Sequence, residues 1–247
     1  MCADLADTSV FQPLRAKCAM RRERVQRTIL GLRLIADTGI SGVQELGAVL
    51  ARQLGLPDSS YAARRVFQDY LVESKLVHYA VLPYFRRGLA VVRLSLAGDL
   101  LCQEAGWQVV ESEWERLLRL HNAENTPAHA AMILAFCREA RRRNFTVQLV
   151  PVIDGLPLEA VPDVLVEQGG QRWYVEIERH RRFKPEKWRN QEAIQGFTAF
   201  CTRSPRRRER LAADINRLGI AGFGTDLESL LQRSQSAAPG PLWVQRW

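Results

Sequence analysis

Apolar residues between positions 21 and 106 recur at helical spacing and then at strand spacing, whereas residues 1–20 show no clean periodicity. From residue 21 they fall every three or four positions until Gly39, which predicts an amphipathic helix that ends at this glycine. The same spacing predicts two more helices, and alternation predicts two strands after them. The predicted helices cover about 21–38, 43–54 and 61–71, the predicted strands cover 76–82 and 90–96, and a helix over 97–105 follows.

The third of these helices has an apolar side and a polar side. Three helices followed by a hairpin whose connection carries arginine is the layout of a winged helix-turn-helix. The segment Leu94-Ser-Leu-Ala-Gly98 is also similar to the leucine-threonine-x-x-glycine ending of winged-helix regulators. Six side chains are predicted to contact double-stranded DNA, namely Tyr61, Arg64, Arg65 and Gln68 on the polar side of the helix and Arg86 and Arg87 between the strands.

The second half of the chain begins with a helix that Pro127 opens, because proline is tolerated at the first helical position. A strand over 145–153 is predicted next, followed by two strands joined at Gly169-Gly170. After Glu178 the pattern predicts a helix that continues to about residue 202. The last predicted elements are a basic helix over 206–218, a strand over 220–224 and a helix over 227–232.

Three carboxylates lie on the strands around the Gly169-Gly170 turn. Glu176 and Glu178 are two apart on one strand and share a face, and Asp163 on the partner strand meets them if the register allows. Clustered carboxylates repel one another unless a cation lies between them, and oxygen ligands suit Mg²⁺ or Mn²⁺. All three are therefore the predicted metal ligands, although acids on the solvated face of a hairpin are also common. His129, a lone histidine, is interpreted as a packed or surface residue.

The chain carries a net charge of +8 and a pI near 9.7, so a polyanionic partner is expected. Arginine clusters occur in both halves, and arginine favours bidentate phosphate contacts. The composition is that of a soluble globular protein, and no apolar run is long enough to span a membrane. The first residues lack a secretory signal, which predicts a cytoplasmic protein, and the five scattered cysteines are interpreted as free thiols.

Residues 126–232 follow the order helix, strand, Pro-Asp strand, Glu-x-Glu strand, helix, strand. This order resembles the core of the PD-(D/E)XK nuclease superfamily. The resemblance implies that Asp163 and Glu176 hold Mg²⁺ or Mn²⁺ and that a lysine two positions later activates water. Glu178 occupies the position of that lysine. The resemblance then implies three candidates for the missing group: Lys184 or Lys187 as a migrated lysine, or Gln191 as a group that orients the substrate. Alternatively, Glu178 binds a second metal ion.

A winged helix followed by this core resembles the replication-relaxation family of plasmid and mobile-element proteins, and Glu176-Ile-Glu178-Arg179 is close to a motif of that family. The resemblance implies a DNA-binding protein that serves replication, mobilisation or transcriptional control. In this hypothesis the nuclease-like half is inactive and contacts DNA or forms a homodimer. Two alternatives stay open. One is a metal-dependent DNA endonuclease targeted by its winged helix, and the other is an assembly subunit that binds a protein partner through Trp243 and Trp247.

The sequence thus predicts an α+β protein with two domains. An N-terminal winged helix-turn-helix precedes an α/β restriction-endonuclease-like core, in which helices flank a mixed sheet. The predicted segments are an arm over 1–20, the winged helix over 21–106, a connector helix over 107–125, the nuclease-like domain over 126–234 and a flexible tail over 235–247.

Overall fold

The computed structural model describes residues 9–12, 22–84, 88–153, 161–179, 183–192, 194, 196–233 and 239–247, without the side chains of 22, 190–192 and 233. The chain divides into two compact units, Met1–Arg119 (unit 1) and Leu120–Trp247 (unit 2). The boundary falls inside the segment predicted as a connector. Each unit has a hydrophobic core of its own. None of the described helices combines the length and apolarity needed to cross a membrane.

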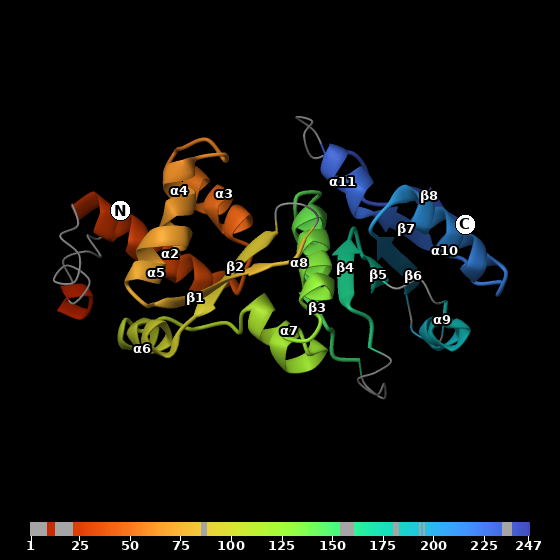
Figure 1. Cartoon of the computed structure of the whole chain (residues 1–247), viewed down its shortest axis with the longest axis horizontal. Coiled ribbons are helices and arrows are strands. Elements are labelled where there is room, and N and C mark those ends of the chain that lie inside the picture. The colour runs from red at the N-terminus through yellow and green to blue at the C-terminus, as the bar shows by residue number, and fades with distance from the viewer. Residues whose placement is uncertain are drawn as a thin grey trace. The chain divides into compact units, whose positions relative to one another are not determined.

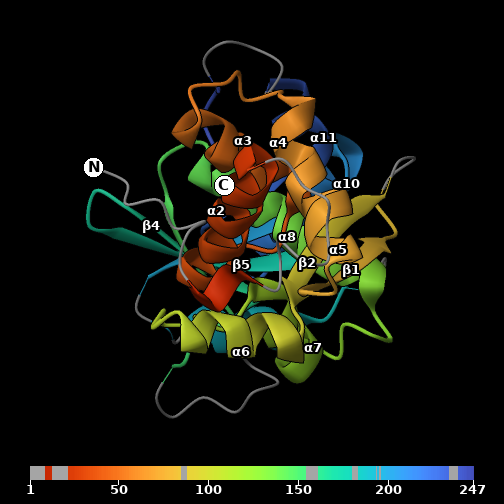
Figure 2. The ribbon, with the colours of Figure 1, turned by 90° about the vertical axis from the view of Figure 1, so that its left-hand side faces the viewer.

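Unit 1 begins with helices that pack against one another (Figure 2). They are η2 (Ser9–Phe11), α2 (Arg22–Thr38), α3 (Val43–Gln53), α4 (Tyr61–Arg65), the π-helical η3 (Val66–Tyr70) and α5 (Leu71–Glu73). The three helices predicted here are confirmed, and Gly39, with a φ of 64°, follows the last residue of α2. Phe11 lies in the segment predicted as a loose arm, yet its ring is buried 5.6 Å from that of Trp107.

An antiparallel hairpin follows, formed by β1 (Val77–Leu82) and β2 (Leu89–Leu94). Gly42, between α2 and α3, forms an isolated antiparallel bridge with Val91 of β2. Next come α6 (Leu96–Glu104), whose N-cap Ser95 accepts a hydrogen bond from Gly98 N, and α7 (Glu113–His121). Ser112 and Glu115 exchange backbone and side-chain hydrogen bonds, a capping box that fixes the start of α7.

Unit 2 contains a mixed six-stranded sheet flanked by helices, as predicted. Its elements are α8 (Pro127–Arg141), β3 (Thr146–Leu149), β4 (Val164–Gln168), β5 (Gln171–Glu178), α9 (Pro185–Glu192), β6 (Phe197–Thr202), α10 (Pro205–Asn216), β7 (Phe223–Asp226), α11 (Leu227–Arg233) and β8 (Gln245–Arg246). The strand order is β3-β4-β5-β6-β7-β8, with β5, β6 and β7 parallel and the other pairs antiparallel.

Helices pack on both sides of this sheet (Figure 1). The helix α8 contacts β3, β4 and β5, and α11 contacts α8 and β7. The helix α10 contacts β6 and β7, and its residues Ala212 and Ile215 share a buried cluster with Trp188 of α9 and Phe200 of β6. The Trp188 contact holds α9, the helix that carries Lys187, against this cluster.

Two segments differ from the predictions. The helix expected to run to residue 202 ends at Glu192, and Phe197–Thr202 forms β6 between β5 and β7. A strand buried between two parallel neighbours is apolar on both faces, so its sequence lacks the alternation that marks a half-buried strand. Residues 239–247, predicted as part of a flexible tail, include β8, and the Trp247 ring stacks 4.9 Å from Phe200. Trp243 lies 5.8 Å from Trp173, so both terminal tryptophans pack within unit 2.

Candidate functional site

The β4–β5 hairpin sets the geometry of the candidate site. Gly169 and Gly170 have φ values of 58° and 78°, the positive pair that a two-residue hairpin turn requires. The register pairs Val164 with Val175, so the next position along places Asp163 beside Glu176. Asp163 Oδ2 accepts a hydrogen bond of 2.7 Å from Ile177 N. The predicted hairpin is therefore confirmed, and its register brings Asp163 to β5.

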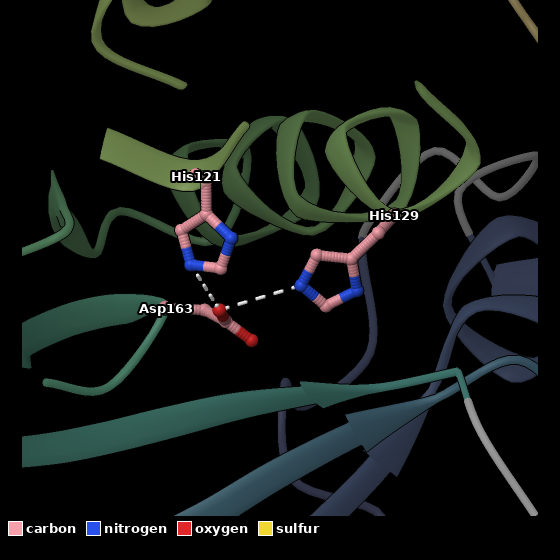
Figure 3. Close-up of side chains that lie close together, drawn as sticks. All are labelled: His121, His129 and Asp163. Carbon is pink, nitrogen blue, oxygen red and sulfur yellow. Dashed lines mark hydrogen bonds and ion pairs between the residues drawn. The ribbon is translucent and has the colours of Figure 1, made fainter. Parts of the chain in front are cut away.

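Two histidines contact the other carboxylate oxygen of Asp163 (Figure 3). His121 Nε2, at the end of α7, lies 2.7 Å from Asp163 Oδ1, and His129 Nε2, in the first turn of α8, lies 3.4 Å from the same oxygen. Burial opposes the charge on Asp163, but the hydrogen bonds from His121 and His129 outweigh it, so the pKa of this carboxyl lies far below its usual value. The same hydrogen bond raises the pKa of His121.

Glu176 and Glu178 both contact the ammonium group of Lys187, which belongs to α9. The Lys187 Nζ atom lies 2.6 Å from Glu176 Oε2 and 3.0 Å from Glu178 Oε1. Burial, together with the negative charge of Asp163, raises the pKa of Glu176 to about 8 against the opposing effect of Lys187. Burial also opposes the charge of Lys187, but the two glutamates outweigh it and raise the pKa of its ammonium group. Lys187, one of the two lysines named from the sequence, thus contacts both glutamates.

Lys184 and Gln191 are the other two catalytic candidates predicted in this segment. Lys184 lines a cavity beside the acids, and the Gln191 side chain lies outside the described residues. Among the described residues, the cluster of metal-ligating side chains whose donor atoms lie within 4.8 Å of one another consists of His121, His129 and Asp163. This set differs from the predicted trio, since it takes Asp163 without Glu176 or Glu178.

The two histidines are functional candidates that sequence reasoning missed. They stand eight residues apart, at the end of one predicted helix and in the first turn of the next. Taken separately, each is an ordinary helical histidine. Their shared position on either side of the break before Pro127 is the signal that could have identified them.

A cavity of about 540 Å³ adjoins Lys187 and Glu178. Residues from the end of β5, from α9 and from the start of α10 line it. Its cationic side chains are Arg179, Lys184, Lys187, Arg206, Arg207 and Arg210. Three of these belong to the first turns of α10, where the helix dipole also favours anions. Its acidic side chains are Glu178 and Asp214, so the cavity is suited to a polyanion that reaches Glu178 and Lys187.

The predicted DNA contacts of unit 1 are in different environments. Tyr61 is exposed, and Gln68 is half-buried. Arg64 is also half-buried: a Cβ atom added to Gly47 would lie 2.5 Å from Arg64 Cγ, so this arginine packs closely over α3. Arg65 Nε donates a hydrogen bond of 2.6 Å to Asp69, and its side chain keeps 41% exposure.

Arg86 and Arg87, the two predicted contacts between the strands, lie outside the described residues. Among the predicted contacts that the structure describes, Tyr61 is therefore exposed, and Arg64, Arg65 and Gln68 are half-buried.

No protein-family model, curated protein or solved structure was found to match the chain.

Proposed function

We propose that unit 2 is a metal-dependent nuclease that acts on DNA, and that unit 1 binds the DNA. The observation that carries this proposal is the position of Lys187, whose Nζ lies 2.6 Å from Glu176 Oε2 and 3.0 Å from Glu178 Oε1. A cation placed here supplies the positive charge that Glu178 does not, and such charges stabilise a phosphodiester under attack. Glu178 in the position of the expected lysine is the reason to expect an inactive centre. Lys187 offsets the missing positive charge.

Asp163 and Glu176 fit a divalent ion that prefers oxygen ligands. Each residue is only 3% exposed, and the charge of Asp163 contributes to the raised pKa of Glu176. A cation near both would relieve this repulsion. Bound Mg²⁺ or Mn²⁺ would polarise a phosphoryl oxygen and lower the pKa of a coordinated water. Lys187 would stabilise negative charge on the phosphate, while Glu178 holds the ammonium group in place.

The cationic cavity supports DNA as the substrate class. Glu178 and Lys187 line it, so a phosphate backbone bound along Arg206, Arg207 and Arg210 would lie beside these two residues. Arginine is suited to this contact because its planar guanidinium group can pair with two phosphate oxygens. Positive charge on the backbone path and acids at its end are what a phosphodiesterase requires.

We assign unit 1 to the winged-helix fold and unit 2 to the restriction-endonuclease-like fold as part of the same proposal. Three helices, an antiparallel hairpin and the Gly42–Val91 bridge support the first assignment. The Pro-Asp and Glu-x-Glu strands between α8 and α9 support the second. With both assignments, the resemblance to the replication-relaxation family extends the proposal to DNA processing in a plasmid or mobile element.

The test is cleavage of supercoiled plasmid DNA by the full chain in Mg²⁺ or Mn²⁺. We expect cleavage by the wild type, and a rate that falls by about 100-fold or more in Lys187→Ala because a charge that stabilises the transition state is lost. Arg189→Ala is the matched control. It removes an exposed cation from the same helix, outside the cavity, and should leave the rate unchanged.

Absence of cleavage by the wild type with either ion, in a preparation that binds the same DNA, would contradict the nuclease. The chain would then be a DNA-binding protein with an inactive centre. This is the hypothesis that Glu178 in the lysine position favours. Equal cleavage rates for Lys187→Ala and Arg189→Ala would show that Lys187 takes no part in catalysis.

The DNA-binding role of unit 1 has a separate test. We expect Arg65→Ala to weaken DNA binding and to lower the slope of log K against log salt concentration by about one, as loss of one phosphate contact does. Arg33→Ala is the control, because it removes a similarly exposed arginine from α2. An unchanged slope in Arg65→Ala would show that the helix starting at Tyr61 does not face DNA.

A further inference from the structure

Two histidines and one aspartate of unit 2 direct their donor atoms to one place. His121 Nε2 and His129 Nε2 lie 2.7 Å and 3.4 Å from Asp163 Oδ1. The three donor atoms lie within 4.8 Å of one another. The histidines come from two helices, α7 and α8, and both rings face the carboxylate (Figure 3). Residues far apart in the chain thus converge on a single carboxylate oxygen.

These separations are close to those of a metal site. In a tetrahedral Zn²⁺ site, metal–ligand distances of about 2.0–2.2 Å place neighbouring ligand atoms roughly 3.4 Å apart. The distance of 3.4 Å between His129 Nε2 and Asp163 Oδ1 has this value. A small rotation of the His121 side chain would lengthen its 2.7 Å contact with Asp163 Oδ1 toward the same value. Asp163 Oδ2 is occupied by Ile177 N–H at 2.7 Å, which fixes the carboxylate and leaves Oδ1 as the ligand atom. Outer hydrogen bonds of this kind orient the ligands of metal sites.

We propose that His121, His129 and Asp163 bind one transition-metal ion of the kind that prefers nitrogen donors, such as Zn²⁺, Co²⁺ or Ni²⁺. Two imidazoles and one carboxylate suit these ions, whereas Mg²⁺ prefers oxygen donors alone. The side chains of His121 and His129 are 26% and 17% exposed, so an ion and a water molecule as a further ligand can enter from solvent. The site shares Asp163 with the proposed nuclease centre, but its two imidazole ligands take no part in that centre, so the histidine variants test it separately from DNA cleavage.

A proton on His121 is the competing explanation of the cluster. The hydrogen bond to Asp163 raises the pKa of His121, and the resulting imidazolium would by itself balance the charge of Asp163. Charge balance therefore gives no reason for a second imidazole at the same oxygen. A metal ion gives that reason, because it requires several donors around one point.

Titration of Co²⁺ into the full chain, followed by visible absorption, tests the site directly. We expect one Co²⁺ per chain, and affinity that falls by about 100-fold or more in His121→Gln and in His129→Gln. His78→Gln is the matched control: it changes an exposed histidine of β1 in unit 1 and should leave the affinity unchanged. A large excess of Mg²⁺ should not displace the Co²⁺.

The proposal is overturned if neither histidine variant changes the Co²⁺ affinity, or if the wild type binds no Co²⁺. If a variant fails to fold, NMR of the wild type labelled with ¹⁵N-histidine tests the site through its imidazole signals. Co²⁺ should broaden the signals of two histidines and spare that of His78, and unchanged signals of all histidines would exclude the site. Plasmid cleavage is measured separately. Cleavage without Co²⁺ binding would contradict only the proposed His–His–Asp site, and Co²⁺ binding without cleavage would contradict only the proposed nuclease.

Discussion

Two buried carboxylates that lie side by side across the β4–β5 hairpin, Asp163 and Glu176, have different partners. Asp163 accepts hydrogen bonds from two imidazoles and a backbone N–H, and its pKa is lowered. Glu176 contacts an ammonium group that it shares with Glu178, and its pKa is raised to about 8. Both residues are 3% exposed. Burial alone therefore does not set the charge of a carboxyl group here: hydrogen bonds from two histidines lower the pKa of Asp163, and the charge of Asp163 adds to burial in raising the pKa of Glu176.

This difference assigns separate roles to neighbouring acids. Carboxyl groups whose environments drive their pKa values apart are a common arrangement at catalytic sites, where one stays ionised and the other exchanges a proton near neutral pH. Asp163 is the permanent anion of the pair. Glu176 is the group whose charge responds to a bound cation.

The largest expected effect follows from removing the charge of Asp163. Asp163→Asn keeps the size of the side chain but leaves His121 and His129 facing a neutral amide. We expect the free energy of unfolding at pH 7 to fall by about 3 kcal/mol, as for other buried ion pairs that lose one partner. Urea denaturation followed by circular dichroism measures the change.

Glu178→Gln is the comparison for that experiment. The Glu178 side chain is 16% exposed and its partner Lys187 keeps the contact with Glu176, so we expect a loss below about 1 kcal/mol. Equal losses in Asp163→Asn and Glu178→Gln would mean that the histidines do not hold Asp163 as the structure indicates.

The second effect is on the pH dependence of stability and comes from Glu176. Its folded pKa of about 8 lies above its ordinary value of 4.5, so the folded state binds more protons than the unfolded state between these pH values. Stability therefore falls as pH rises through this range, by at most about 1.4 kcal/mol per pH unit.

Glu176→Gln removes the carboxyl group that takes up this proton. We expect the decline between pH 5 and 8 to become shallower and the variant to gain roughly 1–2 kcal/mol at pH 8 relative to the wild type. Denaturation series at several pH values give the slope directly. A slope that stays the same would show that Glu176 is ionised throughout.

The sequence predicted the hairpin and the helices around it because their signals are local. The Gly169-Gly170 turn and the alternation beside it determine the register that places Asp163 near Glu176. Pro127 marks the start of α8 in the same way. Lys187 could be named as one of two candidate lysines, but its choice over Lys184 depends on how α9 packs through Trp188.

The remainder of the site could not be predicted because it depends on tertiary contacts. His121 and His129 meet only because α7 and α8 bring their ends to the same carboxylate. The strand β6 is buried on both faces, so its pattern could not be told from that of a buried helix. The Trp247 indole donates to Ile220 O at 2.8 Å, a contact between segments that no local pattern links.

The smallest effect tests whether His121 is the charged partner of Asp163. Its pKa is raised above 6.5, so its contribution to stability is complete below pH 6.5 and is lost as pH rises through the folded pKa. We expect His121→Gln to lower stability by about 1 kcal/mol at pH 6, discounted for its partial exposure, and by less at pH 9. His78→Gln, in unit 1, should show no such trend. A deficit that is the same at both pH values would show that His121 stabilises Asp163 as a neutral donor, so that the negative charge of Asp163 stays unbalanced until a cation binds.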